Sequence, residues 1–163
     1  MKKVEHGKTF DRNAANPPAF EIFHNTVTEG YPEHWHTAIE IIMPTRGEYE
    51  VVVGKDSYNL KEGDIIMINS GVVHGMRFVS QGERIVMLVE PGCVENQEEM
   101  ETIFLRLPAI YFKKEDEEDP FYLFLRSQIL ELVREYDNEG AVMTHRICTG
   151  LKELFSEFGR KGF

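Results

Sequence analysis

Short runs of alternating apolar and polar residues fill the chain between positions 19 and 90. Each run has the length of an ordinary β-strand, and turn-forming segments such as Pro44-Thr45-Arg46-Gly47 separate the runs. The runs cover positions 19–24, 38–43, 49–53, 56–60, 64–69, 75–79 and 84–90. Parallel strands need crossover connections of about a dozen residues, and none separates consecutive runs between positions 38 and 90. The pattern therefore predicts antiparallel strands joined by hairpins, as in a sandwich or barrel.

Beyond position 93 the apolar residues recur at three- and four-residue intervals, which is typical of amphipathic helices. A first stripe consists of Phe121, Phe124, Leu125, Ile129, Leu132, Val133 and Tyr136, and Gly140 can end that helix. A second stripe consists of Met143, Ile147, Leu151, Leu154, Phe155 and Phe158. The short loop between them predicts an antiparallel pair. Either both stripes cover the barrel, or the pair also builds a subunit interface.

The chain is the length of a single domain, and its segments divide by pattern. We expect a polar amino-terminal arm at 1–18, a β-barrel at 19–92, an acidic connector at 93–119 and the helical pair at 120–163. The fold class is therefore mainly β, with a carboxy-terminal helical pair.

A formal net charge of −10 would repel the phosphate backbone of nucleic acids, so this chain is not expected to bind DNA itself. Its apolar runs are far shorter than the roughly 20 residues that span a bilayer, and no apolar segment follows the basic start. We therefore expect a cytoplasmic protein without a membrane partner. Cys93 and Cys148 are too few for a disulfide framework, and we expect reduced thiols.

Three histidines and a glutamate carry the candidate chemistry. His34, His36 and Glu40 share parity along one extended run, so their side chains could face one interior, and His74 opens a later strand after a turn. Imidazole and carboxylate ligands suit one divalent transition metal: zinc, iron, manganese or nickel. Alternatively the four line a polar pocket in which Glu40 merely accepts hydrogen bonds from the imidazoles.

The other residues and motifs give weaker evidence of function. Trp35 has the opposite parity and is expected to pack, while His6, His24 and His145 lack partners at comparable spacing and are expected at the surface or in packing. Gly-x-Ser-x-Gly, a phosphate-binding glycine loop and Cys-x-x-Cys are absent from the sequence, so nucleophilic catalysis has no candidate. We therefore assign no catalytic residue.

At these positions the chain resembles the cupins. The first cupin signature is a glycine, then His-x-His, Glu and Gly, and His34-x-His36-x3-Glu40-x6-Gly47 matches its core. Gly30 stands two residues closer to His34 than is usual for the first glycine of this signature. The resemblance implies a cupin barrel, a double-stranded β-helix or jelly roll.

The second cupin signature is only partly present. Gly63, Gly71 and His74 occupy its glycine and histidine positions, whereas Asn69 replaces a proline and Phe78 an asparagine. These departures fall at turn and packing positions and leave all four metal-type positions filled. Residues 20–90 are covered by this resemblance.

Within the cupins, the chain is similar to the amino-terminal effector-binding and dimerisation domain of AraC-type transcription regulators. The run from His34 to Ile42 followed by Gly47, the Gly63-Asp64 pair before an apolar strand and the His74 turn resemble that group's spacing, and a helical pair follows the barrel. The resemblance implies a small-molecule effector (a sugar, acid or amine) bound at the four residues directly or through a metal. It implies a homodimer formed through the second helical stripe. DNA would be bound by a helix-turn-helix domain that is missing from this chain.

Two other functions stay open. A metal-dependent cupin enzyme, an oxygenase or isomerase, would also explain the four ligands. A cupin that stores or senses metal is the third interpretation. Effector identity, the target promoter, and activation versus repression are beyond the sequence.

Overall fold

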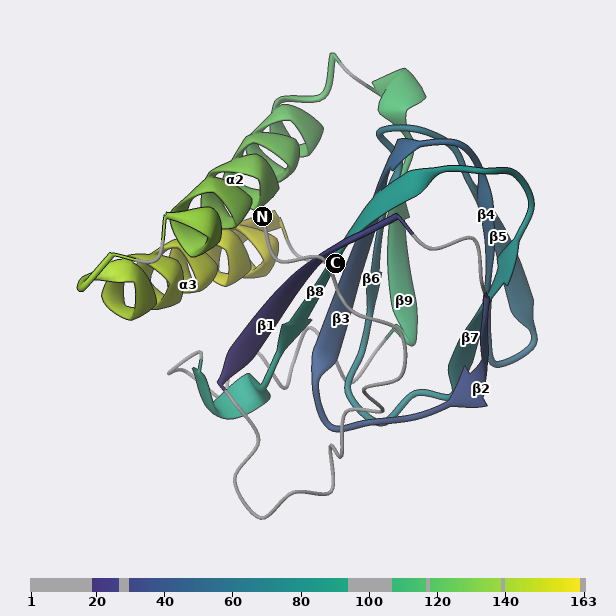
Figure 1. Ribbon diagram of the computed structural model, residues 1–163, viewed down its shortest axis with the longest axis horizontal. Helices are drawn as coiled ribbons and strands as arrows, with labels where there is room; N and C mark the ends of the chain where they lie inside the picture. Colours follow the sequence, from purple (N-terminus) through teal and green to yellow (C-terminus); the bar gives the residue numbers. More distant parts are fainter. Residues whose placement is uncertain (1–18, 27–29, 94–106, 117, 139, 162–163) are drawn as a thin grey trace.

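The computed structural model describes residues 19–26, 30–93, 107–116, 118–138 and 140–161. Their strands and helices form three layers, with one sheet between a second sheet and a pair of helices (Figure 1). The predicted arm at 1–18 and the connector residues 94–106 lie outside the described residues.

Both sheets are antiparallel throughout, as predicted. The five-stranded sheet, here sheet A, has the order β1 (Phe20–Asn25), β8 (Glu83–Val89), β3 (Ile39–Arg46), β6 (Ile65–Ile68) and β9 (Ala109–Phe112). The four-stranded sheet, sheet B, has the order β2 (Tyr31–His34), β7 (His74–Phe78), β4 (Tyr49–Val53) and β5 (Asp56–Leu60). The mainly β fold class is thereby confirmed as a cupin-like sandwich followed by two helices.

Each of the seven predicted runs overlaps a strand, and two further strands, β2 and β9, lie outside those runs. Strand β2 fills the gap before the second run, and β9 lies inside the stretch predicted as an acidic connector. β9 pairs with β6 and extends sheet A at its edge. The predicted connector therefore contributes a strand to the sandwich.

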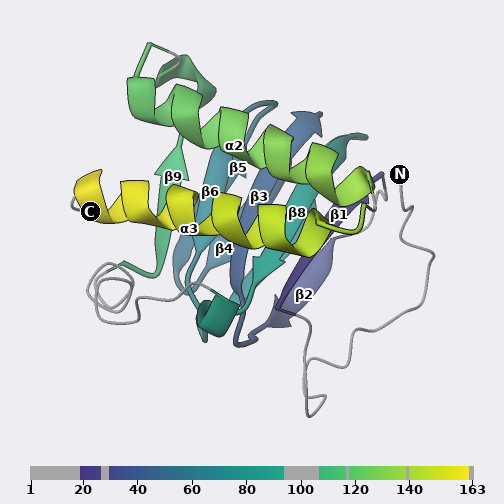
Figure 2. The ribbon, with the colours of Figure 1, turned by 90° about the vertical axis from the view of Figure 1, so that its left-hand side faces the viewer.

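The helices α2 (Pro120–Asp137) and α3 (Met143–Lys161) lie across the outer face of sheet A (Figure 2). Asp119 caps α2 by accepting a 2.8 Å hydrogen bond from the Phe121 amide, and Pro120 occupies the first turn, where no amide is needed. A Cβ at Gly150 of α3 would lie 2.9 Å from a methyl of Leu132, so this glycine permits close packing on α2. Among the described residues, no helix is both long and apolar enough to cross a membrane.

The second helical stripe packs inside its own chain. Ile147, Leu151, Leu154, Phe155 and Phe158 are at most 1 % exposed and belong to one core cluster with the outer face of sheet A and with α2, and Met143 packs partly buried against that cluster. The expectation that these residues form a dimer interface needs correction, since side chains already buried in the monomer offer no surface to a second copy.

Strand β3 separates two cores. Ile39, Ile41 and Met43 belong to the cluster beneath the helices, whereas Ile42 belongs to the cluster between the sheets. Glu40 shares the face of Ile42 and reaches sheet B through a contact with His74. One strand thus carries the candidate site on one face and the support of the helical layer on the other.

Candidate metal centre

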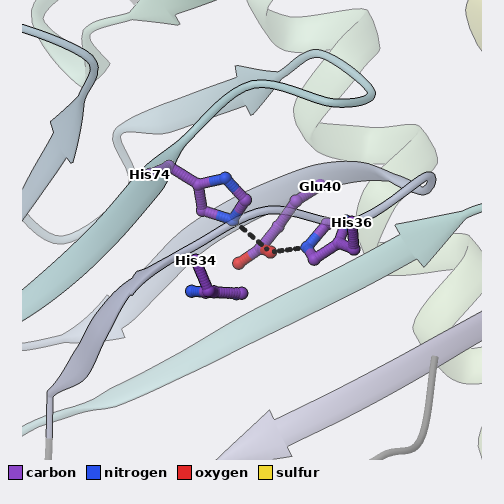
Figure 3. Close-up of side chains that lie close together, drawn as sticks. All are labelled: His34, His36, Glu40 and His74. Carbon is purple, nitrogen blue, oxygen red and sulfur yellow. Dashed lines mark hydrogen bonds and ion pairs between the residues drawn. The ribbon is translucent and has the colours of Figure 1, made fainter. Parts of the chain in front are cut away.

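The four candidate residues meet where the chain crosses from sheet B to sheet A (Figure 3). His34 ends β2, His36 lies in the crossing segment, Glu40 is the second residue of β3, and His74 begins β7. One ligand atom from each lies within 4.8 Å of those of the other three. In the part of the chain that the structure describes, this is the one group of three or more such residues that could hold a metal ion.

The four predicted residues do lie together, but not for the predicted reason. A single strand was expected to carry His34, His36 and Glu40 on one face, but positions 35–38 leave the strand conformation. The site forms because β2 and β3 belong to different sheets and His36 turns inward between them. The register pair His34–His74 places the fourth residue beside the first.

Backbone carbonyls orient all three imidazoles. In each ring Nδ1 lies 2.8 to 2.9 Å from a carbonyl oxygen two residues away, the acceptors being Pro32 for His34, Ala38 for His36 and Val72 for His74. Since a carbonyl oxygen only accepts, each Nδ1 must carry the hydrogen and donate. The Nε2 atoms of neutral rings are then lone pairs available to a metal, with outer hydrogen bonds of the kind that fix metal-binding histidines.

The carboxylate of Glu40 completes the cluster. Its Oε2 lies 2.9 Å from His36 Nε2 and 3.1 Å from His74 Nε2. Two neutral rings that donate from Nδ1 would present lone pairs to this oxygen, so the contact requires positive charge, supplied either by protons on Nε2 or by a metal ion. This donor set fits one divalent transition metal.

The charges around Glu40 keep it ionised. Burial by itself raises the pKa of this carboxyl, but the hydrogen bonds and positive charge of His36 and His74 outweigh burial and hold the pKa at about 2. Burial lowers the pKa of His34, which favours its neutral form. An ionised carboxylate and a neutral imidazole are the forms that bind metals.

The site opens to solvent on one side. His36, Glu40 and His74 are at most 7 % exposed, whereas His34 is an exposed residue. Trp35 next to it is 64 % exposed, so the expectation that it packs in the interior is wrong. A ligand could therefore approach past His34.

Hydrogen bonds hold the crossing segment in place. The Gly71 amide donates to the His36 carbonyl at 2.8 Å, and the Thr37 hydroxyl donates to the Glu90 carboxylate at 3.0 Å. Gly71 has a φ of +74°, a conformation that favours glycine. This explains why the second cupin signature has a glycine at this position. A Cβ at Gly30 would lie 2.3 Å from a backbone carbonyl oxygen of β7, which explains why the first cupin signature begins with a glycine here.

Sequence reasoning missed the role of Asp64. This buried carboxylate accepts hydrogen bonds from the amides of Lys61 and Lys114 and, at 2.6 Å, from the Tyr111 hydroxyl. Burial and the Asp64 charge raise the pKa of Tyr111. A surface cavity of roughly 560 Å³ lies over this anchor and contains none of the four cluster residues in its lining. Asp64 therefore attaches β9 and stands apart from the metal-type cluster.

A second buried polar group was also missed. Arg84 of β8 is 0 % exposed, and its guanidinium carbon lies 4.9 Å from the ring centre of Tyr49 and 5.3 Å from that of Tyr31. Tyr31 accepts a hydrogen bond from Asn25 at 2.7 Å. These contacts fix the start of β2, the strand that ends at His34.

The other histidines stay outside the site. His145 is exposed on α3, and His24 is half-buried on β1. His6 lies outside the described residues.

Comparison with known families finds one similarity over part of the chain. Residues 25–90 match the family model described as "Cupin domain", and this match spans the four cluster residues. This part of the chain is therefore similar to cupin domains. No curated protein sequence matches the chain.

Several solved structures are similar to this chain, and one of them shares the fold over most of it. ToxT K231A from Vibrio cholerae matches with a TM-score of 0.55 at 10 % identity over 90 % of this chain, which spans 58 % of the ToxT chain. A cupin-2 domain protein from Shewanella frigidimarina gives a TM-score of 0.41 at 16 % identity, covering 47 % of this chain and 76 % of its own. An oxalate decarboxylase mutant from Bacillus subtilis gives 0.38 at 18 % identity, covering 44 % and 20 %.

Proposed function

We propose that this chain is the small-molecule sensing domain of an AraC-type transcription regulator and that its effector binds at the cluster of His34, His36, Glu40 and His74. The similarity to ToxT, an AraC-family regulator, supports the proposal because it covers the helices as well as the sandwich. DNA binding is assigned to a helix-turn-helix domain outside these 163 residues, since the acidic chain itself would repel DNA.

The two faces of β3 carry this proposal. Glu40 lies in the cluster, while Ile39 and Ile41 pack beneath α2 and α3. An effector that binds more tightly when β3 is in one of two positions favours that position, and with it the matching arrangement of the helices. The difference between the two affinities sets the size of the shift. Sensing therefore needs only a small displacement of one strand, transmitted directly into the helical layer.

The metal, where bound, would be held by the three Nε2 atoms and Glu40. It supplies a Lewis acid that attracts a hydroxyl, carboxylate or amine group of an effector. The protein supplies the rest: the carbonyls of Pro32, Ala38 and Val72 fix the rings, and the open side at His34 admits the effector. The effector class that fits is a small sugar, acid or amine.

Homodimerisation is the second part of the proposal. Since the stripe from Ile147 to Phe158 is buried, a dimer would use the solvent-facing side of the helices. Effector-dependent movement of the helical layer would then alter the relation between two subunits.

A ligand panel tests the proposal. The chain is scanned with sugars, carboxylic acids and amines, with and without Zn²⁺, Fe²⁺, Mn²⁺ or Ni²⁺, for a rise in the unfolding midpoint. A ligand at 100 times its Kd stabilises by about 2.7 kcal/mol, which raises the midpoint by roughly 5–10 °C. The rise should vanish in His36→Ala and persist in His145→Ala, which alters an exposed histidine on α3.

Hydrogen exchange then separates sensing from simple binding. The effector should change amide protection in α2 and α3, which do not touch the cluster. Binding that leaves helix protection unchanged would contradict a sensing role, and a panel without any stabilising metal or ligand would contradict binding at the cluster.

The exposed side of His34 also favours a second candidate, a metal-dependent cupin enzyme, because catalytic metal sites keep an open position. The same panel decides between the two. Conversion of a panel compound, followed by mass spectrometry and abolished by His36→Ala, supports an oxygenase or isomerase. Stoichiometric binding with the compound recovered unchanged supports the sensor.

A further inference from the structure

The two cysteines meet although 55 positions separate them in the sequence. Cys93 ends the short 3-10 turn Pro91–Cys93 that follows β8, and Cys148 lies in the second turn of α3. Their sulfur atoms are 3.5 Å apart. Both are free thiols, and the contact joins the end of a strand of sheet A to the helical layer.

The surroundings suit a reaction between the two sulfurs. Both residues are half-buried, so a small reagent can reach them, and Cys93 packs partly against the core under the helices. Burial and the neighbouring Cys148 raise the pKa of Cys93 to about 11, which slows its attack on a disulfide but does not oppose the oxidised form, so the contact between the two sulfurs is what favours the bond. Among the described residues, no third histidine, cysteine or carboxylate joins them to form a metal-type group.

We propose that Cys93 and Cys148 form a reversible intramolecular disulfide by exchange with a small-molecule disulfide such as oxidised glutathione. One thiol loses its proton and attacks a glutathione sulfur, forming a mixed disulfide and releasing one glutathione. The second sulfur, already in contact, attacks the first and displaces the other glutathione. Two thiols are oxidised, one glutathione disulfide is reduced to two glutathiones, and the two thiol protons end on these products.

The bond would tie the sheet to the helices. It would close a loop that contains β9 and α2, and it would fix α3 to the end of β8. The Cys93 amide donates to the Glu90 carbonyl at 2.9 Å, and the Glu90 carboxylate accepts the Thr37 hydroxyl beside His36. Oxidation would therefore act at the end of β8, which contacts the segment beside His36 through Glu90 and would be bonded to α3 through Cys93.

A redox titration of the full chain tests the disulfide. The protein is equilibrated with mixtures of reduced and oxidised glutathione, alkylated, and measured as intact mass. In the oxidising mixtures we expect both alkylatable thiols to disappear together, with a mass lower by two hydrogens and a peptide joining Cys93 to Cys148. The unfolding midpoint should rise by roughly 10 °C, as expected for a loop of this length, and dithiothreitol should reverse the rise.

Single substitutions provide the control. Cys148→Ser and Cys93→Ser should each keep one alkylatable thiol and show no oxidant-dependent rise in midpoint, while their unfolding curves report whether they fold. The proposal is overturned if the wild-type chain retains two alkylatable thiols in the most oxidising mixture. It is also overturned if oxidation yields only glutathione adducts or disulfide-linked dimers.

Discussion

Shortening Leu151 tests whether the second helix belongs to the core of one chain or to a subunit interface. Its side chain is 0 % exposed within the cluster that joins α3 to α2 and sheet A. Buried Leu-to-Ala changes cost about 2.7–5 kcal/mol, because transfer energy is lost and a cavity remains. Close packing at the neighbouring Gly150 limits collapse of the cavity, so we expect Leu151→Ala to cost about 4 kcal/mol.

Urea unfolding gives the measurement. The variant should have a lower midpoint at an unchanged slope, and the midpoint should be the same at two protein concentrations tenfold apart, because the lost contacts lie within one chain. Glu153→Ala, an exposed position on the same helix, should change stability by less than about 0.5 kcal/mol. A cost below about 1 kcal/mol, or a change in the mass of the native particle, would refute the intramolecular assignment.

Three further substitutions test the site and its supports. Glu40→Gln removes the one carboxylate of the cluster and should weaken Zn²⁺ binding by about 100-fold or more in competition with a chromophoric chelator; equal affinity would exclude Glu40 as a ligand. Tyr111→Phe removes the hydroxyl bound to the Asp64 carboxylate and should cost about 1.5–3 kcal/mol in urea, whereas the matched change Tyr58→Phe on the adjacent ring should cost less; equal costs would contradict the anchor. Gly30→Ala places a methyl against a carbonyl oxygen of β7 and should cost about 1–3 kcal/mol, and a neutral result would show that β2 can shift freely.

The alternation of residues revealed the strands that bury one face. β4 and β5 begin and end at the predicted residues, and β4 alternates between buried and half-buried positions. β2 gives no such signal, because all four of its residues are exposed and one is Pro32, which an edge strand tolerates. β9 has only four residues within an acidic stretch, and its role depends on the distant carboxylate of Asp64.

The candidate ligands could be predicted from residue type and spacing, but their arrangement could not. Alternation along a single strand would place His34, His36 and Glu40 on one face. The segment that crosses between the sheets brings the same residues together, because His36 turns inward from its irregular backbone. The helical stripe is ambiguous for a related reason. A stripe such as that around Leu151 has the same periodicity whether it covers its own sheet or a second subunit, so only the folded chain distinguishes the two.

A site placed at a crossover between sheets depends on the spacing of both. His34 and His74 are carried by sheet B, Glu40 by sheet A, and His36 by the segment that joins them. An ion bound by all four would favour one separation of the sheets, and the helices pack on the other face of sheet A. Under the proposed function, affinity at the cluster and the position of the helical layer would be thermodynamically linked, and the link would be reciprocal. A contact that holds the helices against sheet A would then also adjust the affinity of the cluster, which a sensor requires and a catalyst does not.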